Sequence, residues 1–366
     1  MTPFDSAVSD DHGDPPLAAS LPQLTASLPG VGGRIKVEPE DFVVEELPAY
    51  QPTGAGEHLF LWIEKRDVSA DALLSHIARR LGIARGDIGM AGLKDRRAVT
   101  RQYVSVPASV EARLPEVDAD NVRVLSSARH GNKLRTGHLR GNRFDVLIRD
   151  VVDDAGPRAE SIIAALSNHG LPNYYGDQRF GHGGETLRLG LDLLTGRRQE
   201  RDIPRPQRRF LLRLALSSVQ SSLFNAVLAE RVRTNQLTTV LIGDVLQVVA
   251  SGGQFVCVDP VTDQARCQQR EVVPTGPIFG PKMRAAQEAA GELEQRVLAT
   301  SGLTVTDFAR YRKLLPGTRR ALAVWPDELS LAVEPTGLRV RFALPPGSYA
   351  TVLLGESMKV ELQEGA

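Results

Sequence analysis

The sequence of 366 residues predicts an α+β protein with two domains. Short runs that alternate apolar and polar residues are typical of strands, and apolar residues at helical spacing lie between them. The two kinds of run do not follow a regular strand–helix–strand order, which favours α+β over α/β. The chain is also longer than a single hydrophobic core usually supports.

The N-terminal part alternates strands with one clear helix. Ser69 is a predicted N-cap, and the helix that follows carries Leu73, Ile77 and Leu81 on one face before Gly82 ends it. Strands are predicted at 34–37, 42–46, 58–65, 102–106, 122–125 and 143–149.

The rest of the chain is more helical up to about residue 320. Helical spacing is found after Pro157 and at 187–194, 217–233 and 284–299. Residues 245–249 and 254–258 are typical of a hairpin around Ser251-Gly252-Gly253. A last strand is predicted at 338–344, followed by a short helix capped by Ser348.

Charge argues against a non-specific binder of polyanions, because 44 basic and 44 acidic residues give zero net charge. Only seven of the basic residues are lysine. The planar fork of arginine suits phosphates and base edges better than the point charge of lysine. A GC-rich genome also enriches arginine, and both explanations stay open.

Cysteine and histidine usage predicts a protein of the cytoplasm without a metal. Cys257 and Cys267 are too few for a disulfide framework, and the seven histidines are dispersed. Residues 1–30 are rich in Pro, Ser and Ala and predict a disordered extension, not a signal peptide. No window is predicted to be apolar over the length of a membrane span.

Common nucleotide and hydrolase motifs are missing from the sequence. No Gly-Lys pair exists, which excludes a P-loop, and Gly30-Val31-Gly32-Gly33 precedes a strand instead of opening a helix. No Gly-x-Ser-x-Gly elbow is present.

The segment 92–102 is the most informative part of the chain. It places Asp95 between Lys94 and the pair Arg96 and Arg97. Neighbouring cations favour the ionised form of a carboxyl group. An ionised carboxylate beside phosphate-seeking cations suits catalysis on a nucleotide. On spacing alone, a solvated turn between two strands remains the alternative.

Six segments carry a resemblance to a known family. They are Pro39–Glu45, Gly92–Thr100 with its Gly-Leu-Lys-Asp-x-x-Ala-x-Thr pattern, and residues 139–144, 172–181, 220–225 and 344–351. Taken together and in this order, they resemble the TruD family of tRNA pseudouridine synthases, from about residue 33 to residue 355.

The resemblance implies a fold and a reaction. The fold would be a pseudouridine-synthase-like mixed sheet in a catalytic domain formed by residues 31–171 and 323–366, with a more helical family-specific insertion at 172–322. The reaction would isomerise a uridine of tRNA, expected at position 13 in the D-arm, to pseudouridine without a cofactor. The enzyme would be a cytoplasmic monomer with tRNA as its partner and no metal or membrane.

The resemblance also implies roles for single residues. Asp95 would be the nucleophile, and either Lys94 or Lys36 would neutralise it or contact the phosphate. A flipped-out uridine needs aromatic stacking and edge hydrogen bonds, for which Phe42, Tyr349 and Asn142 are the candidates. The family commonly has phenylalanine where Tyr349 stands. On position alone, the alternatives are a core residue for Phe42, a residue in the first turn of a helix for Tyr349 and a turn residue for Asn142.

Arginines in basic stretches are candidates for contacts to RNA phosphates. They are Arg96, Arg97, Arg140, Arg143 and Arg179, although the loop around Arg179 equally suits a brace at the junction between the two domains. Two rival functions stay open: a non-catalytic RNA-binding or RNA-folding module, and a pseudouridine synthase that acts on another RNA site.

Overall fold

The computed structural model describes residues 21–360, which form two compact units. Within that range the sheet unit comprises residues 23–171 and 324–360, and the helical unit comprises residues 21–22 and 172–323. After residue 23 the chain leaves the sheet unit at the short strand β8 (Leu171–Pro172) and returns to it at the short strand β13 (Ala323–Val324).

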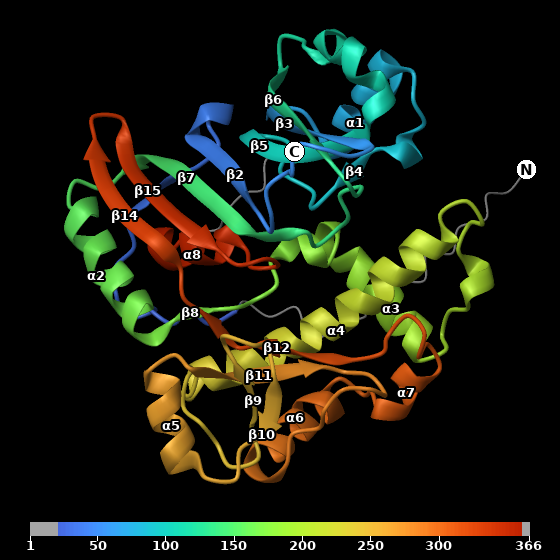
Figure 1. Ribbon diagram of the computed structural model, residues 1–366. Coiled ribbons are helices and arrows are strands. Elements are labelled where there is room, and N and C mark those ends of the chain that lie inside the picture. The colour runs from blue at the N-terminus through green and yellow to red at the C-terminus, as the bar shows by residue number, and fades with distance from the viewer. Residues whose placement is uncertain (1–20, 361–366) are drawn as a thin grey trace, which may run out of the picture. The chain divides into compact units, whose positions relative to one another are not determined.

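The sheet unit is built on nine strands (Figure 1). These are β1 (Gly32–Arg34), β2 (Phe42–Pro48), β3 (His58–Arg66), β4 (Gly89–Met90), β5 (Val99–Pro107), β6 (Val122–His130), β7 (Leu139–Val151), β14 (Asp327–Glu334) and β15 (Gly337–Leu344). Its helices are α1 (Ala70–Leu81), α2 (Ala155–His169) and α8 (Ala350–Met358), with 3-10 turns η1 (Pro39–Asp41), η2 (Arg85–Asp87) and η3 (Ala108–Val117).

The main path of the sheet runs β14-β15-β7-β2-β5-β3-β6, with β1 added to β7 and β4 added to β5. Only the β2–β5 pair among the named pairs is parallel. The sheet is therefore mixed and its helices do not alternate with strands, which confirms the predicted α+β class. The C-terminal strand β15 pairs with β7 from Leu338 to Leu344.

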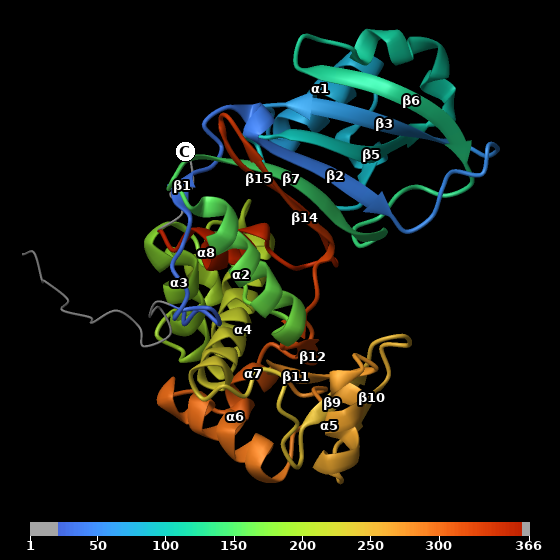
Figure 2. The same cartoon turned by 90° about the vertical axis from the view of Figure 1, so that its left-hand side faces the viewer.

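Helices cover one face of this sheet in two separate places (Figure 2). Apolar residues of α2 and α8 pack on β2, β7 and β15, whereas those of α1 and η3 pack on β3, β5 and β6. In register, Val44 of β2 lies opposite Thr100 of β5, and Lys65 of β3 lies on the other side of Thr100. Directly opposed side chains share a face, so both apolar clusters lie on the same face.

The predicted α1 helix is confirmed down to its caps. The Ser69 hydroxyl accepts a hydrogen bond from the Ala72 amide at 3.1 Å, and Gly82 ends the helix with a φ of 65°. The N-cap and the glycine that ends the helix act through residues close in the chain, so a single sequence reveals them. The strand predicted at 34–37 is wrong beyond Arg34, because Lys36 has a left-handed φ of 56° and turns the chain.

Residues 21–30 correct the predicted boundary of the N-terminal extension. The Gln23 amide donates to the Gly355 carbonyl at 2.8 Å, and the Thr25 amide and hydroxyl donate to the buried Glu356 carboxylate at 3.0 and 2.6 Å. A buried carboxylate needs such donors, so residues 23–30 are part of the sheet unit, and the extension ends before residue 30. Residues 1–20 lie outside the described residues.

The helical unit contains the helices α3 (Glu185–Leu194), α4 (Arg208–Arg233), α5 (Pro260–Gln268), α6 (Glu288–Thr300) and α7 (Val305–Ala309), and the turns η4 (Asp177–Arg179), η5 (His182–Gly184) and η6 (Glu200–Asp202). Its small sheet has the order β10-β9-β11-β12, with β9 (Val245–Val248), β10 (Gln254–Val256), β11 (Val272–Ile278) and β12 (Thr318–Ala321). The antiparallel β9–β10 pair confirms the predicted hairpin.

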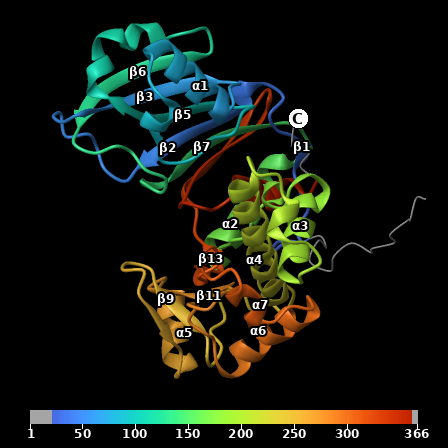
Figure 3. The same ribbon diagram turned by 90° about the vertical axis from the view of Figure 1, so that its right-hand side faces the viewer.

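The long helix α4 organises this unit (Figure 3). Leu212, Leu216, Val219 and Leu223 are buried against residues of α3, α6 and α7. The helix is also long and apolar enough, by length and composition, to cross a membrane, contrary to the prediction from the sequence. Since 72% of that apolar window is buried inside the protein, α4 is a core helix of its unit.

Several elements were not predicted. Strand β11 reads Val-Val-Pro-Thr-Gly-Pro-Ile, and its two prolines and glycine argue against a strand, yet six of its seven residues are buried between β9 and β12. Strand β14 lies at the edge of the large sheet and is largely exposed. Helix α8 begins at Ala350 with Tyr349, not Ser348, at the N-cap.

Gly141 allows β15 to approach β7 where the two strands end. A Cβ at this position would lie 2.3 Å from the Leu344 carbonyl oxygen. We predict that Gly141→Ala lowers the free energy of unfolding by about 1–3 kcal/mol, because backbone atoms must shift. The matched control is Gly355→Ala in α8, where a Cβ meets no atom within 4 Å. Chemical denaturation that finds both variants equally stable would refute this packing constraint.

Candidate active site

A group of polar side chains lies between the two apolar clusters on the covered face of the sheet. We call it the polar floor, and its members are Glu46 of β2, Lys65 of β3, Thr100 and Gln102 of β5, Asn142 of β7 and Lys94 of the loop between β4 and β5. All except Asn142 are buried. Register places Glu46 opposite Asn142, and Lys65 opposite Thr100.

Three atoms of the polar floor are buried without a hydrogen-bond partner among residues 21–360. They are the Thr100 hydroxyl, Gln102 Oε1 and Asn142 Oδ1. A buried polar atom without a partner costs about 1–3 kcal/mol, so sites of this kind are retained where a ligand or water completes them. The polar floor therefore offers hydrogen-bonding groups to a polar ligand.

Asp95 lies in the loop that covers the polar floor, and its side chain is 37% exposed. Lys36 Nζ lies 3.6 Å from Asp95 Oδ2 and 4.3 Å from the centroid of the Phe42 ring. The backbone of Lys36 is held in the left-handed region, a conformation that costs a non-glycine residue about 1–2 kcal/mol. Strain of this size at a residue that contacts a candidate nucleophile is typical of functional sites.

Lys94 does not pair with Asp95. Its ammonium lies 2.8 Å from Glu46 Oε2, and both side chains are buried. Glu46 also accepts a hydrogen bond from the Tyr103 amide at 3.3 Å. Of the two lysines that the sequence left open as the partner of Asp95, the structure thus brings Lys36 to the carboxylate and gives Lys94 to Glu46.

Lys65 approaches the main chain of Asp95. Its ammonium donates to the Asp95 carbonyl oxygen at 2.6 Å, and the side chain is fully buried. Burial lowers the pKa of Lys65 from 10.5 to about 8; Lys94 lowers it too, whereas Asp95 and Asp67 act in the opposite direction. Sequence reasoning missed Lys65, although it is a charge on the inward face of an otherwise apolar strand.

The predicted substrate-binding residues differ in exposure. Phe42 is 1% exposed and packs edge-on against Phe144, with 6.2 Å between the ring centroids. Asn142 is half-buried in the polar floor. Tyr349 is half-buried at the N-cap of α8, shortly after the end of β15 at Leu344, which pairs with Asn142.

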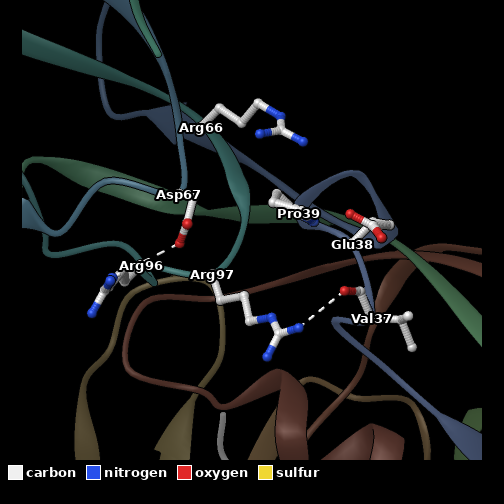
Figure 4. Close-up of a pocket in the computed structure, with 7 residues that line it drawn as sticks. All are labelled: Val37, Glu38, Pro39, Arg66, Asp67, Arg96 and Arg97. Carbon is white, nitrogen blue, oxygen red and sulfur yellow. Dashed lines mark hydrogen bonds and ion pairs between the residues drawn. The ribbon is translucent and has the colours of Figure 1, made fainter. Parts of the chain in front are cut away.

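A cavity of about 350 Å³ lies beside the Lys36–Asp95 pair along the chain. It is lined by Val37, Glu38, Pro39, Arg66, Asp67, Arg96 and Arg97 (Figure 4). The Arg97 guanidinium donates to the Val37 carbonyl at 3.0 Å, and Arg96 lies 3.8 Å from Asp67. Arg66 forms an ion pair with Glu40. Arg96 and Arg97 are exposed and retain donors for a phosphate group.

Three predicted RNA-binding arginines have partners within their own units. Arg143 pairs with Glu45 at 2.9 Å and Glu328 at 2.6 Å, on the sheet face opposite Asn142. Arg140 donates to the Pro48 carbonyl at 3.2 Å. Arg179 donates to the hydroxyls of Ser217 and Ser221 of α4, so it fixes its loop to a helix of the same unit.

The Arg179 loop and α4 are joined a second time. Asn225 accepts a hydrogen bond from the Tyr175 amide and donates one to the Tyr175 carbonyl, both at 2.9 Å. Two of the segments that resemble the TruD family, 172–181 and 220–225, therefore contact each other inside the helical unit. Among residues 21–360, no three His, Cys, Asp or Glu side chains are placed to hold a metal ion.

The mixed α+β fold agrees with the class of RNA-modifying enzymes called pseudouridine synthases, and comparison with protein families assigns the chain to that class. The family model described as tRNA pseudouridine synthase D (TruD) matches residues 20–201 and 206–357. The chain belongs to this family of isomerases.

Named relatives agree. A tRNA pseudouridine synthase D of Anaeromyxobacter sp. (strain Fw109-5) is 45% identical over 344 residues, which cover 92% of this chain and 96% of the relative. A protein of the same name from Thermus thermophilus is 43% identical over 341 residues, covering 93% and 92%.

A solved structure from Methanosarcina mazei that carries the TruD name has a TM-score of 0.72 and 22% identity. It covers 93% of this chain and 96% of its own, and this likeness supports the mixed α+β fold.

The Lys94–Glu46 pair supports a stability prediction. We expect Lys94→Met to lower the free energy of unfolding by about 3–5 kcal/mol, because it leaves the buried Glu46 carboxylate uncompensated. Adding Glu46→Gln removes that charge and restores most of the loss. Thermal unfolding of the two single variants and the double variant measures the coupling. Additive losses in the double variant would contradict a buried ion pair.

Proposed function

We propose that this chain converts a uridine of tRNA to pseudouridine, with position 13 in the D-arm as the expected target. The reaction breaks the bond between C1′ of the ribose and N1 of uracil, turns the base and forms a bond from C1′ to C5, while C5 loses its proton and N1 gains one. Membership of the TruD family supports the reaction class. The single observation that carries the assignment to a site is the Lys36–Asp95 pair above the polar floor.

In this proposal Asp95 is the nucleophile. Its carboxylate is partly exposed, so it is accessible to a nucleotide, and the Lys36 ammonium lies 3.6 Å from it. Whether the ribose or the pyrimidine ring is attacked does not change the requirement for an ionised oxygen at this point. Lys94 takes a supporting role, because its pair with Glu46 fixes the residue directly before the nucleophile.

The polar floor would bind the base. Uracil presents two carbonyl acceptors and one N–H donor along its edge, and a flipped base is held by edge hydrogen bonds and stacking. The unpartnered Oδ1 of Asn142 is an acceptor for that N–H group. Phe42 is too buried to stack freely with its whole ring, so Tyr349 is the better stacking candidate, while Phe42 supports Lys36.

Phosphate contacts would come from the cavity beside the nucleophile. Arg96 and Arg97 follow Asp95 directly, so a target nucleotide at Asp95 brings its backbone within their reach. Arg140 is exposed and adds positive charge near the end of β2. We assign catalysis to the sheet unit and propose that the helical unit, residues 172–322, is the family-specific insertion. The enzyme would act as a cytoplasmic monomer.

The nucleophile is tested by substitution. We predict that Asp95→Asn lowers the rate of isomerisation at least about 1,000-fold, because an amide cannot attack as a carboxylate does. The assay follows tritium release from C5-labelled uridine in unmodified tRNA and maps the product. Asp87→Asn removes an exposed carboxylate on the neighbouring turn η2 and is the matched control. Comparable turnover in wild type and Asp95→Asn would overturn the assignment.

The same assay separates the rival functions. A wild-type protein that binds tRNA without isomerising any uridine would be a binding or folding module. Pseudouridine at a position other than 13 would change the substrate and leave the chemistry intact.

The arginine contacts are tested by salt dependence. We predict that Arg97→Gln weakens tRNA binding and lowers the slope of log affinity against log salt by about 1, because one phosphate contact is lost. Arg143→Gln is the control, since its guanidinium is held by Glu45 and Glu328. Fluorescence titrations between about 50 and 200 mM salt distinguish them. An equal change of slope in both variants would place RNA on the other face of the sheet.

A further inference from the structure

Three of the seven lysines in this chain converge on the Asp95 loop. Lys36 contacts the Asp95 carboxylate, Lys65 donates to the Asp95 carbonyl, and Lys94 anchors the preceding residue to Glu46. Arginine fills most other basic positions of the chain. Although arginine is enriched over lysine in the chain as a whole, these three positions carry lysine. This indicates that the compact ammonium group is required there.

Lys65 is the least expected of the three. It lies on β3 between Thr100 of β5 and Val122 of β6, and no part of it reaches solvent. A guanidinium at this depth would need partners for five N–H groups, whereas an ammonium has three donors and is able to lose its proton. Among the hydrogen bonds of residues 21–360, the bond to the Asp95 carbonyl is the one that satisfies this ammonium.

The Asp95 loop has few other restraints. Among its main-chain groups between residues 92 and 97, the described hydrogen bonds are one from the Ala98 amide to the Arg96 carbonyl and one from Lys65 to the Asp95 carbonyl. Lys36 holds the carboxylate at 3.6 Å, which is longer than a hydrogen bond. Lys65 therefore forms the one described hydrogen bond to the main chain of Asp95 itself, whereas the Lys94–Glu46 pair holds the preceding residue.

We propose that Lys65 is a positioning residue: its buried ammonium fixes the main chain of Asp95 and so aims the carboxylate at the target nucleotide. The proposal rests on the proposed function of Asp95. Lys65 touches no reacting atom, because it lies beneath the loop and is covered by it. Misplacing a catalytic group by about 1 Å costs on the order of 100-fold in rate.

The arrangement also makes positioning dependent on pH. The charged groups that face Lys65 are Asp95 and Lys94 of the loop and Asp67 just after β3, while β5 and β6 contribute Thr100 and Val122. Burial brings the pKa of Lys65 to about 8. As pH rises through this value the ammonium becomes an amine, which donates a weaker hydrogen bond, and the loop loses its anchor.

Stability changes in the opposite direction. The unfolded chain keeps the proton of this lysine up to about 10.5, so between about 8 and 10.5 it binds more protons than the folded protein. The contribution of Lys65 to stability therefore rises with pH across that window. If Lys65 served only the fold, its deprotonation would raise stability without lowering activity. A positioning role predicts that activity falls while stability rises.

The test compares Lys65→Met with wild type and with Lys313→Met, which removes an exposed lysine of the helical unit. We expect kcat of wild type to decline above about pH 8, and we expect Lys65→Met to lower kcat about 10- to 100-fold with KM unchanged and to abolish that decline. Its melting temperature at neutral pH stays at or above that of wild type, because a buried charge has been removed. Lys313→Met retains the wild-type rate and profile.

A second measurement does not depend on the variant. With only seven lysines, isotope-labelled side chains give few NMR signals, and one of them should titrate near pH 8 and vanish in Lys65→Met or Lys65→Gln. A wild-type kcat and pH profile in Lys65→Met, or no lysine titrating in that range, would overturn the proposal. Failure of the Asp95 assignment is recognised separately, since it leaves Asp95→Asn active.

Discussion

The ion pair between Lys94 and Glu46 is the interaction on which the arrangement of the site depends. It buries two opposite charges at 2.8 Å beneath a loop that has little hydrogen bonding of its own. In that setting each charge is tolerable only because the other is present. The pair therefore fixes the loop on the sheet, and Asp95 is the next residue in the chain.

The sheet makes room for such charges because its helices cover it in two places. Apolar residues under α1 and under α2 and α8 form separate clusters on one face, and the polar floor lies between them. A single continuous helical layer would have required apolar residues there. The division of the cover thus creates both the space and the low-dielectric surroundings in which a carboxylate and three lysines act together.

Arginines and lysines have different tasks in this protein. Exposed arginines such as Arg96 and Arg97 present forked donors at the cavity rim, and Arg143 bridges two carboxylates on the opposite face. The buried positions near Asp95 carry lysines, whose ammonium fits where a guanidinium would leave donors unsatisfied. Arginine and lysine count equally as positive charges, but near Asp95 the arginines are exposed and the lysines lie deeper in the protein.

The sequence by itself determined the α+β class, the caps of α1 and the β9–β10 hairpin, since these depend on local spacing and on residues close in the chain. The segment containing Asp95 stood out by its charges and by its resemblance to a family. It did not reveal which lysine meets the Asp95 carboxylate, because Lys36 is distant in the chain and reaches it through a left-handed turn. Only the tertiary structure decided that Lys94 belongs to Glu46, that Arg143 faces away, and that Lys65 lies beneath the loop. These outcomes depend on strand register, which a one-residue shift would reverse and which no local pattern of a single chain specifies.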